Sequence, residues 1–411
     1  MRMRKHHPIS EHWTTADTGH PGTTAFHIGV AQAQQVRNLT PTTLVNRAST
    51  ALNRTFKLSL KTATTTSIRA AGMSNQAAFI DAAKAHPFSV REAAYPTPKA
   101  TEIVVRSRAV AANPVDWKLQ DFAFFPIPYP NIFGQDVAGE VVETGADVKG
   151  FSKGQRVLAH ALGLVTQDPR NGAFQQYVAV SEQLTAAVPD SLSYEAACVL
   201  PLCLSTAAAG LYQQTHLALE HPSTTPKPTG KTVLIWGGSS AVGSCAIQLA
   251  KASGYEVIAT ASRKNAAYVQ DLGAEPFDHA SASVADDIVA AFKGKEVAGA
   301  YDCICQGETT TTCVRILEKA AGSGKIATVE PGSEKNSTEK VQVVSVMAPS
   351  IASNEVAKVV YHEFLPKALA EGTLKAKPDP LIVGKGLEEV QAAVDRCKAG
   401  VSAQKVVVSI P

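Results

Sequence analysis

The chain has 411 residues, of which 45% are apolar and 18% charged, and its formal net charge is +3. These values are typical of a globular protein with a sizeable core and leave room for two domains. No run of about 18 consecutive apolar residues is evident, so no membrane span is predicted. The seven cysteines form no C-x-x-C pair and lie mainly in apolar segments, which predicts reduced thiols in an intracellular protein.

Residues 1–73 differ in composition from the rest of the chain. They contain nine Lys or Arg but only two acids, Glu11 and Asp17, and they are rich in Ser and Thr. This composition is typical of a mitochondrial transit peptide. Because no clean amphipathic helix follows Met1, we favour a disordered extension, or an ordered protein that begins at Met73. A cytoplasmic location is then expected, with a mitochondrial one as the alternative. The basic excess lacks interleaved aromatics, so nucleic-acid binding is not predicted.

From residue 75 onward, short apolar strands alternate with turn signals about every ten residues. The clearest strands span residues 103–111, 137–144, 154–160 and 173–180. This spacing predicts a small antiparallel barrel. Pro114 disfavours a helical conformation at Asn113, so a loop or short helix is expected to open there.

Beyond residue 200 the pattern changes to alternating strands and helices. Strands are expected at 233–236, 257–261, 300–305 and 325–329, with helices between them. This alternation predicts an α/β fold with a parallel, doubly wound sheet. A final helix at 387–398 lies between two tail strands. We therefore expect domains at 74–199 and 200–371, with residues 372–411 completing the first.

The segment from Val233 to Lys251 carries the strongest functional signal. Four apolar residues precede a Gly/Ser turn, and apolar residues then recur at helical spacing. Such a turn lets the backbone approach a pyrophosphate at a helix N-terminus. A serine replaces the middle glycine of G-x-G-x-x-G. The serine hydroxyls either donate to the pyrophosphate or only tighten the turn. The predicted cofactor contacts here are Gly238, Ser239, Ser240, Ala241, Val242 and Gly243.

Together these motifs resemble the medium-chain dehydrogenase/reductase superfamily over residues 74–411. The motifs are Asn113-Pro-Val-Asp116, residues 134–141, Ser205-Thr-Ala207, the 237–243 turn and Leu272-Gly-Ala274. The zinc-independent branch is most similar, with its quinone oxidoreductases and fungal trans-acting enoyl reductases. The resemblance implies a GroES-like catalytic domain beside a Rossmann domain. It also implies a monomer or a homodimer.

The resemblance also bears on metal binding. Zinc-dependent alcohol dehydrogenases place Cys, His and Cys ligands at positions that hold Asn113, Gln135 and Leu202 in this chain. Catalytic zinc needs three such ligands and one open position. The cysteine-rich structural zinc lobe has no counterpart between His160 and Gly172. We therefore predict that the protein holds no metal.

The end of the second predicted strand indicates which nicotinamide cofactor binds. NAD binders usually carry an acid there, whereas this chain has Ser262, Arg263 and Lys264. Lys and Arg favour a 2′-phosphate through charge-assisted hydrogen bonds, so NADPH is predicted. The alternative is that the two cations form a solvated helix start. The resemblance adds four further cofactor contacts: Tyr268, His279, Val329 and Lys405.

The predicted catalytic residues are Lys118, Asn113 and Thr206. The resemblance places Lys118 at the active site, where its ammonium would polarise a carbonyl; the alternative is a surface lysine. Asn113 would position the loop and donate to substrate, or form an Asx turn before proline. Thr206 would touch the nicotinamide, or cap a helix. Asp116 is expected to be structural.

Several further residues are candidates for the substrate side of the site. Mitochondrial-type enoyl reductases carry a tyrosine where this chain has Phe124, so the final proton is expected from water. An aromatic loop is expected either to line the substrate cleft or to pack in the core, and it contains Phe122, Phe124, Phe125 and Tyr129. His160 and Gln175 are further candidates for the edge of the cleft.

The predicted function is a zinc-independent, NADPH-dependent reductase of an enone or enoyl thioester. Hydride would add to the β-carbon while charge grows on an enolate oxygen. The alternatives are a quinone reductase of the same fold and a non-catalytic cofactor-binding protein. The expected partner is a small-molecule substrate, with an acyl-carrier domain as a further candidate.

Overall fold

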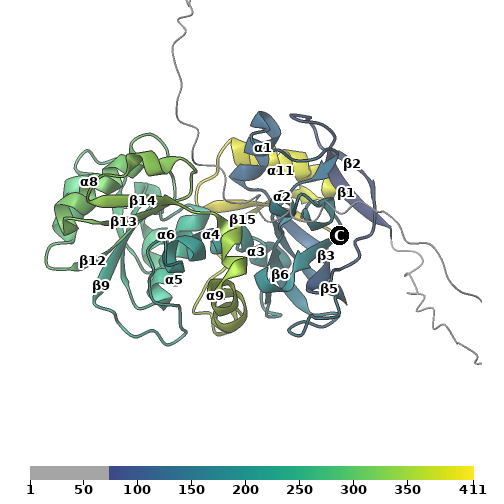
Figure 1. The fold of residues 1–411 in the computed structure, drawn as a ribbon, viewed down its shortest axis with the longest axis horizontal. Helices are drawn as coiled ribbons and strands as arrows, with labels where there is room; N and C mark the ends of the chain where they lie inside the picture. The colour runs from purple at the N-terminus through teal and green to yellow at the C-terminus, as the bar shows by residue number, and fades with distance from the viewer. Residues whose placement is uncertain (1–73) are drawn as a thin grey trace, which may run out of the picture. The chain divides into compact units, whose positions relative to one another are not determined.

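The computed structural model describes residues 74–411 (Figure 1). The predictions for residues 1–73 therefore lie outside the described residues. The described chain contains a β-rich part, here called the β-domain, and a part with a parallel sheet, here called the nucleotide domain.

The β-domain contains two sheets. The smaller has the order β2-β1-β4, and the larger has the order β15-β16-β3-β5-β6-β8, with β7 also paired to β3. All neighbours are antiparallel except β15 and β16. The strands are β1 (Asn75–Ile80), β2 (Ser89–Ala93), β3 (Glu102–Ala111), β4 (Asn131–Ile132), β5 (Asp136–Thr144), β6 (Arg156–His160), β7 (Tyr177–Ser181), β8 (Thr185–Ala187), β15 (Asp379–Lys385) and β16 (Gln404–Ser409).

The C-terminal strands lie in the same sheet as the N-terminal ones. Val407 of β16 pairs with Ala111 of β3, and apolar side chains of both strands share one core. The domain also carries four short helices: α1 (Pro114–Phe122), α2 (Gly163–Thr166), α3 (Tyr194–Ala197) and α11 (Val390–Lys398). Helix α11 packs beside α1, as Figure 1 shows.

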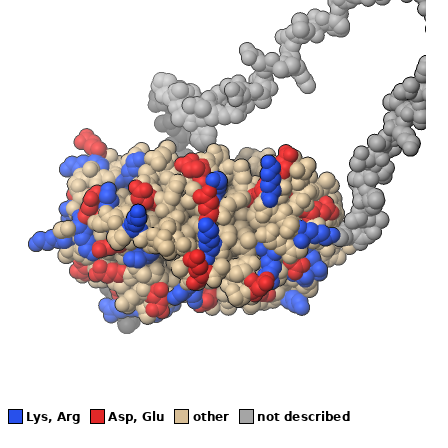
Figure 2. Space-filling model, turned by 90° about the horizontal axis from the view of Figure 1, so that it is seen from below, with Lys and Arg blue, Asp and Glu red and all other residues tan. Residues whose placement is uncertain are grey.

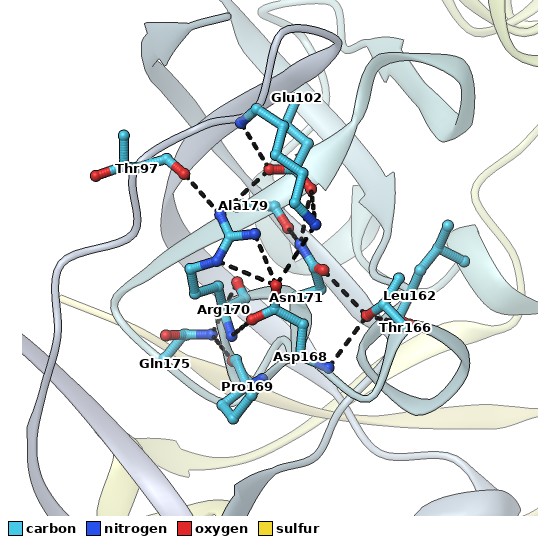
Figure 3. A network of polar contacts seen from close by, with 11 residues as sticks. Thr97, Glu102, Leu162, Thr166, Asp168, Pro169, Arg170, Asn171, Gln175 and Ala179 are labelled. Atoms are coloured by element: carbon cyan, nitrogen blue, oxygen red, sulfur yellow. Dashed lines mark hydrogen bonds and ion pairs between the residues drawn. The ribbon is translucent and has the colours of Figure 1, made fainter. Parts of the chain in front are cut away.

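The loop that follows β6 is fastened to the β-domain by a polar network (Figure 3). The Arg170 guanidinium bonds the Asp168 carboxylate at 2.7 Å and the Thr97 carbonyl oxygen at 2.6 Å. It also lies 3.3 Å from Glu102 at the start of β3, while the Asn171 amide donates to the Ala179 carbonyl of β7. These contacts hold in place the segment between His160 and Gly172, where zinc-dependent relatives carry the cysteine-rich lobe.

The nucleotide domain has six parallel strands in the order β11-β10-β9-β12-β13-β14. Numbered from β9, this order is 3-2-1-4-5-6, which is that of a doubly wound dinucleotide-binding sheet. It confirms the predicted fold class. The strands are β9 (Lys231–Trp236), β10 (Glu256–Ala261), β11 (Glu275–Asp278), β12 (Glu296–Asp302), β13 (Gly324–Thr328) and β14 (Val341–Ser345).

Helices cover both faces of this sheet, and β9 shows why. Val233 and Ile235 pack in the cluster that contains α4 and α5, whereas Leu234 and Trp236 pack with α7 and α8. A strand buried on both faces is continuously apolar, as observed. The helices are α4 (Pro201–Tyr212), α5 (Ala241–Ala252), α6 (Ala266–Asp271), α7 (Val284–Ala291), α8 (Thr309–Ala321), α9 (Glu355–Ala357), a π-helical segment (Lys358–Phe364) and α10 (Leu365–Glu371).

One helical region bears on the expectation that the chain has no membrane span. The helical region Tyr194–Tyr212 has 19 residues and a mean hydropathy of 1.4, which is long and apolar enough to cross a membrane. In this structure 72% of it is buried inside the protein, and α4 packs against α5. Burial in the core accounts for its composition.

Charges of both signs are interspersed over the face in Figure 2. Removing the nine basic and two acidic residues of 1–73 leaves 30 Lys and Arg against 34 Asp and Glu in residues 74–411. The positive net charge of the whole chain therefore comes from its first 73 residues.

Candidate functional site

The Gly/Ser turn joins β9 to α5 at the carboxyl edge of the parallel sheet. Gly237 adopts a φ of +83°, and its backbone N–H donates to the Thr260 hydroxyl at 2.9 Å. A Cβ at Gly243 would lie 2.2 Å from the Gly237 carbonyl oxygen, so this position requires glycine. The Ser240 hydroxyl accepts from the Gly243 N–H at 3.0 Å and caps α5. The turn therefore presents backbone beside the N-terminus of a twelve-residue helix.

The end of β10 adds a second observation that favours a bound dinucleotide. The Ser262 hydroxyl is buried and has no hydrogen-bond partner among the described residues. A buried hydroxyl normally has one, so a ligand atom at this position would satisfy it. Lys264, two residues further on, is exposed and forms no ion pair within residues 74–411. With the glycine turn, these residues fit a nicotinamide dinucleotide.

Arg263, by contrast, already has an acidic partner in Asp278. The two side chains lie 2.7 Å apart. Asp278 ends β11, whose register places it beside Ala261 at the end of β10. The Ala280 N–H and then the Arg263 guanidinium lower the pKa of Asp278. Sequence reasoning missed this acid, although the position of Asp278 after a parallel strand is a signal that it reaches the same edge.

Three other predicted cofactor contacts, Tyr268, His279 and Val329, belong to segments that follow strands of the parallel sheet. The Tyr268 hydroxyl is 2.8 Å from the Ser244 hydroxyl and holds α6 against α5. His279 is exposed, and its backbone N–H donates to Ala261. Val329 directly follows β13. In doubly wound sheets, ligands bind along the carboxyl edge.

Asn265 is a polar residue of this region that the sequence analysis did not single out. Its amide donates to the hydroxyls of Ser239, at 3.3 Å, and Ser402, at 3.0 Å. It therefore joins the glycine turn to the C-terminal tail.

Lys405, a predicted cofactor contact, is buried and bonded to other residues of the protein. It is buried on β16, where its ammonium lies 2.9 Å from the Asp136 carboxylate and also donates to the Asn113 amide oxygen. The Cys203 sulfur is 3.5 Å away. Protein groups therefore engage this ammonium, because a buried carboxylate such as Asp136 needs a counter-charge.

Asn113 is likewise buried and bonded within the protein. Its amide nitrogen donates to the Asp136 carboxylate at 2.8 Å. Its backbone N–H donates to the Asp116 carboxylate, also at 2.8 Å, which caps α1 and confirms the structural role expected of Asp116. In this structure Asn113 positions the start of α1, one of its two predicted roles.

The second oxygen of Asp116 has no partner among the described residues. Asp116 borders a small pocket also lined by Asn131, Phe133, Gly134 and Gln135. Burial raises the pKa of Asp116 to about 7. This carboxyl group therefore retains its proton to near neutral pH.

Lys118 lies two residues after Asp116, and its ammonium is 2.7 Å from the Glu330 carboxylate. Lys118 comes from α1 of the β-domain, and Glu330 follows β13 of the nucleotide domain. The pair thus places an ammonium at the carboxyl edge of the sheet. Sequence reasoning missed Glu330, although it comes directly after a predicted strand at 325–329.

Thr206 and His160 bond within the interior. The Thr206 hydroxyl donates to the Leu202 carbonyl of its own helix at 2.7 Å. The His160 ring lies 2.9 Å from the Ser205 hydroxyl and 3.4 Å from the Gln135 amide oxygen. Burial lowers the pKa of His160 to about 4, so this ring is neutral at physiological pH.

The remaining candidates for the substrate side divide into two groups. Gln175 is buried, and its amide donates to loop carbonyls including that of Gly172, so it is structural. In the aromatic loop, Phe122 and Phe124 are exposed, whereas Phe125 and Tyr129 pack against the core of the β-domain. Core packing thus accounts for Phe125 and Tyr129, and the cleft-lining role stays a prediction for Phe122 and Phe124.

The residues at the zinc-ligand positions have protein partners. Asn113 bonds Asp136, Gln135 contacts His160, and Leu202 donates its backbone N–H to Asp136 at 2.6 Å. Within residues 74–411, no three His, Cys, Asp or Glu side chains group as a metal-ligand set. The donor chemistry at these positions is that of a zinc-independent protein, and the absence of a metal stays a prediction.

Family models and relatives agree with this architecture. Residues 99–190 match the alcohol dehydrogenase GroES-like domain, and residues 241–355 match the zinc-binding dehydrogenase family. The chain is 47% identical over 342 residues to the zinc-binding alcohol dehydrogenase domain-containing protein cipB of Emericella nidulans, covering 83% of this chain and 100% of the relative. It is 42% identical over 341 residues to the trans-enoyl reductase himH of Aspergillus japonicus, covering 83% and 98%.

Solved structures of the same fold include an alcohol dehydrogenase superfamily protein from Novosphingobium aromaticivorans. It has a TM-score of 0.65 and 27% identity, covering 82% of this chain and 100% of that protein. The CurK enoyl reductase has a TM-score of 0.64, covering 82% and 99%, and at 21% identity it shows the fold alone. The chain belongs to the medium-chain dehydrogenase/reductase superfamily, a family of oxidoreductases whose Rossmann domain binds a nicotinamide cofactor.

Proposed function

We propose that the protein is an NADPH-dependent reductase that adds hydride to the C=C bond of an α,β-unsaturated carbonyl compound or enoyl thioester. The observation that carries this proposal is the position of Lys118. Its ammonium lies beside Glu330, at the sheet edge where ligands of doubly wound domains bind. When bound, the nicotinamide supplies the hydride.

The chain's own contribution is electrostatic. As hydride reaches the β-carbon, negative charge grows on the carbonyl oxygen, and an N–H of Lys118 donates to that oxygen. Phe124 replaces the acid tyrosine of mitochondrial-type enzymes, so solvent supplies the proton to the α-carbon. The names of the trans-enoyl reductases among the relatives support this reaction class.

The choice of NADPH is supported by the end of β10. Ser262 offers an unpartnered hydroxyl, and Lys264 offers a solvent-exposed ammonium. Both groups suit a 2′-phosphate better than a 2′-hydroxyl.

The test is to mix the purified full chain with NADPH or NADH and a panel of enones, enoyl thioesters and quinones. Loss of nicotinamide absorbance is expected with NADPH and the first two classes. Lys118→Ala should reduce kcat by about 100-fold or more, as when other donors to a developing oxyanion are removed. Lys231→Ala is a matched control, because Lys231 also pairs with a glutamate, Glu296, at 2.7 Å, but lies at the amino end of β9. Turnover of quinones alone, or cofactor binding with no turnover, would overturn the proposal in favour of the other two functions.

A further inference from the structure

The Lys118–Glu330 contact connects the two domains. Among the ion pairs within residues 74–411, it is the only one between the β-domain and the nucleotide domain. The side chains are 32% and 46% exposed, so the pair is accessible to small molecules. Other polar connections between the domains are hydrogen bonds, such as those of Asn265 with Ser402, Gln248 with Lys375 and the Leu202 N–H with Asp136.

Within the β-domain, the helix that carries Lys118 is held by several contacts. The first turn of α1 is held by the Asn113–Asp116 cap. Further along the helix, Gln120 bonds Gln391 of α11 at 2.9 Å, and Asp121 pairs with Lys398. The helix is therefore fixed on both sides of Lys118.

Glu330 is anchored independently in the nucleotide domain. Its carbonyl oxygen accepts from the Ser333 hydroxyl at 2.8 Å and from the Ser345 hydroxyl at 3.1 Å. These two hydrogen bonds fix the backbone from which the Glu330 carboxylate extends. The carboxylate engages only one of the three N–H donors of Lys118, so two remain for a ligand.

From this geometry we infer that Glu330 positions the Lys118 ammonium across the domain boundary and selects substrates with a neutral group beside the reacting carbonyl. A substrate oxygen that accepts from Lys118 lies close to the Glu330 carboxylate. A second negative charge on the substrate would be repelled there. This inference rests on the proposed function, and it narrows the substrate class to neutral enones and thioesters.

The test compares 2-oxopent-3-enoate with its methyl ester, two enones that differ by one charge placed directly beside the reacting carbonyl. The wild type should favour the ester in kcat/KM, and Glu330→Gln should reduce that preference about tenfold, because the amide removes the charge but keeps the size. Glu330→Ala should lower kcat for the ester about tenfold with little change in KM. Asp286→Ala, which breaks the Lys319–Asp286 pair within the nucleotide domain, should change neither. An unchanged ester preference and kcat in both Glu330 variants would overturn the inference.

A second measurement separates failure of this inference from failure of the proposed function. A double-mutant cycle of Lys118→Ala and Glu330→Ala, read by urea unfolding without substrate, should give non-additive effects. Additive effects would overturn the interdomain positioning even if the protein is an enone reductase. Non-additive effects in a protein that turns over no enone would keep the positioning and reject the proposed function and the substrate class.

Discussion

The Lys405 ammonium lies 2.9 Å from the Asp136 carboxylate, and both groups are almost completely buried. Asp136 also accepts from the Leu202 N–H and the Asn113 amide, so it joins β5, β16, α4 and the start of α1. Burial opposes the charge on Lys405, but the carboxylate raises its pKa above the usual range, and the ammonium stays charged.

Breaking this pair from one side should destabilise the protein strongly. Lys405→Met leaves a buried carboxylate without its counter-charge, and Asp136→Asn leaves a buried ammonium in the same position. Each should lower the free energy of unfolding by about 3–5 kcal/mol, and the double variant should lose less than the sum. Urea unfolding at pH 7 measures all three. Additive losses would show that the pair is not coupled.

The raised pKa of Asp116 predicts a pH-dependent stability. The folded protein holds this proton to about pH 7, whereas the unfolded chain releases it near 3.8. Between these values the folded state binds more protons, so this group lowers the free energy of unfolding as pH rises, by up to about 1.4 kcal/mol per unit. Asp116→Asn removes the titration and keeps an oxygen for the Asn113 N–H. Relative to wild type, the variant should gain stability from pH 4 to pH 7. A constant difference between the two proteins would contradict the assignment.

His160 should change the free energy of unfolding with pH in the opposite direction to Asp116. Its folded pKa is about 4, below the unfolded value of 6.5, because the buried ring resists protonation. The unfolded chain takes up this proton first, so stability falls as pH drops from 6.5 to 4. His160→Gln should lose less stability than wild type over this range. Denaturant titrations at pH 7 and pH 5 test this. Because Asp116 titrates across the same range, each effect must be taken from the difference between variant and wild type.

Cofactor preference should depend on the end of β10. Lys264→Ala is expected to weaken NADPH binding about tenfold and to leave NADH binding unchanged, because only NADPH carries the phosphate that the ammonium would bind. Ser262→Ala should act in the same direction with a smaller effect. Nicotinamide fluorescence titration measures both, with Lys319→Ala as the control, because Lys319 lies on α8 and pairs with Asp286 of α7. Equal losses for both cofactors would instead assign these residues a general binding role.

The fold was largely predictable because its signals are local. Val233, Leu234, Ile235 and Trp236 are continuously apolar because helices cover both faces of β9. Gly243 is required by a contact only six residues away in the chain. The capping role of Asp116 also follows from a spacing of three residues.

The charged contacts of the site were less predictable, because their partners lie far apart in the chain. Lys118 and Glu330 are separated by 212 residues, and Asn113 and Lys405 by 292. Lys405 was expected to reach a cofactor but is buried against Asp136. Arg263 was expected to be available to a phosphate but already pairs with Asp278.

By itself, the sequence determined the two-domain α/β architecture, the glycine turn and the residue types at the zinc-ligand positions. These depend on the periodicity and spacing of neighbouring residues, which a chain carries before it folds. Only the tertiary structure decided which cations are free and which are paired. Burial and distance set the energy of a charge, and both arise when β16 joins β3 and α1 meets the edge of the parallel sheet.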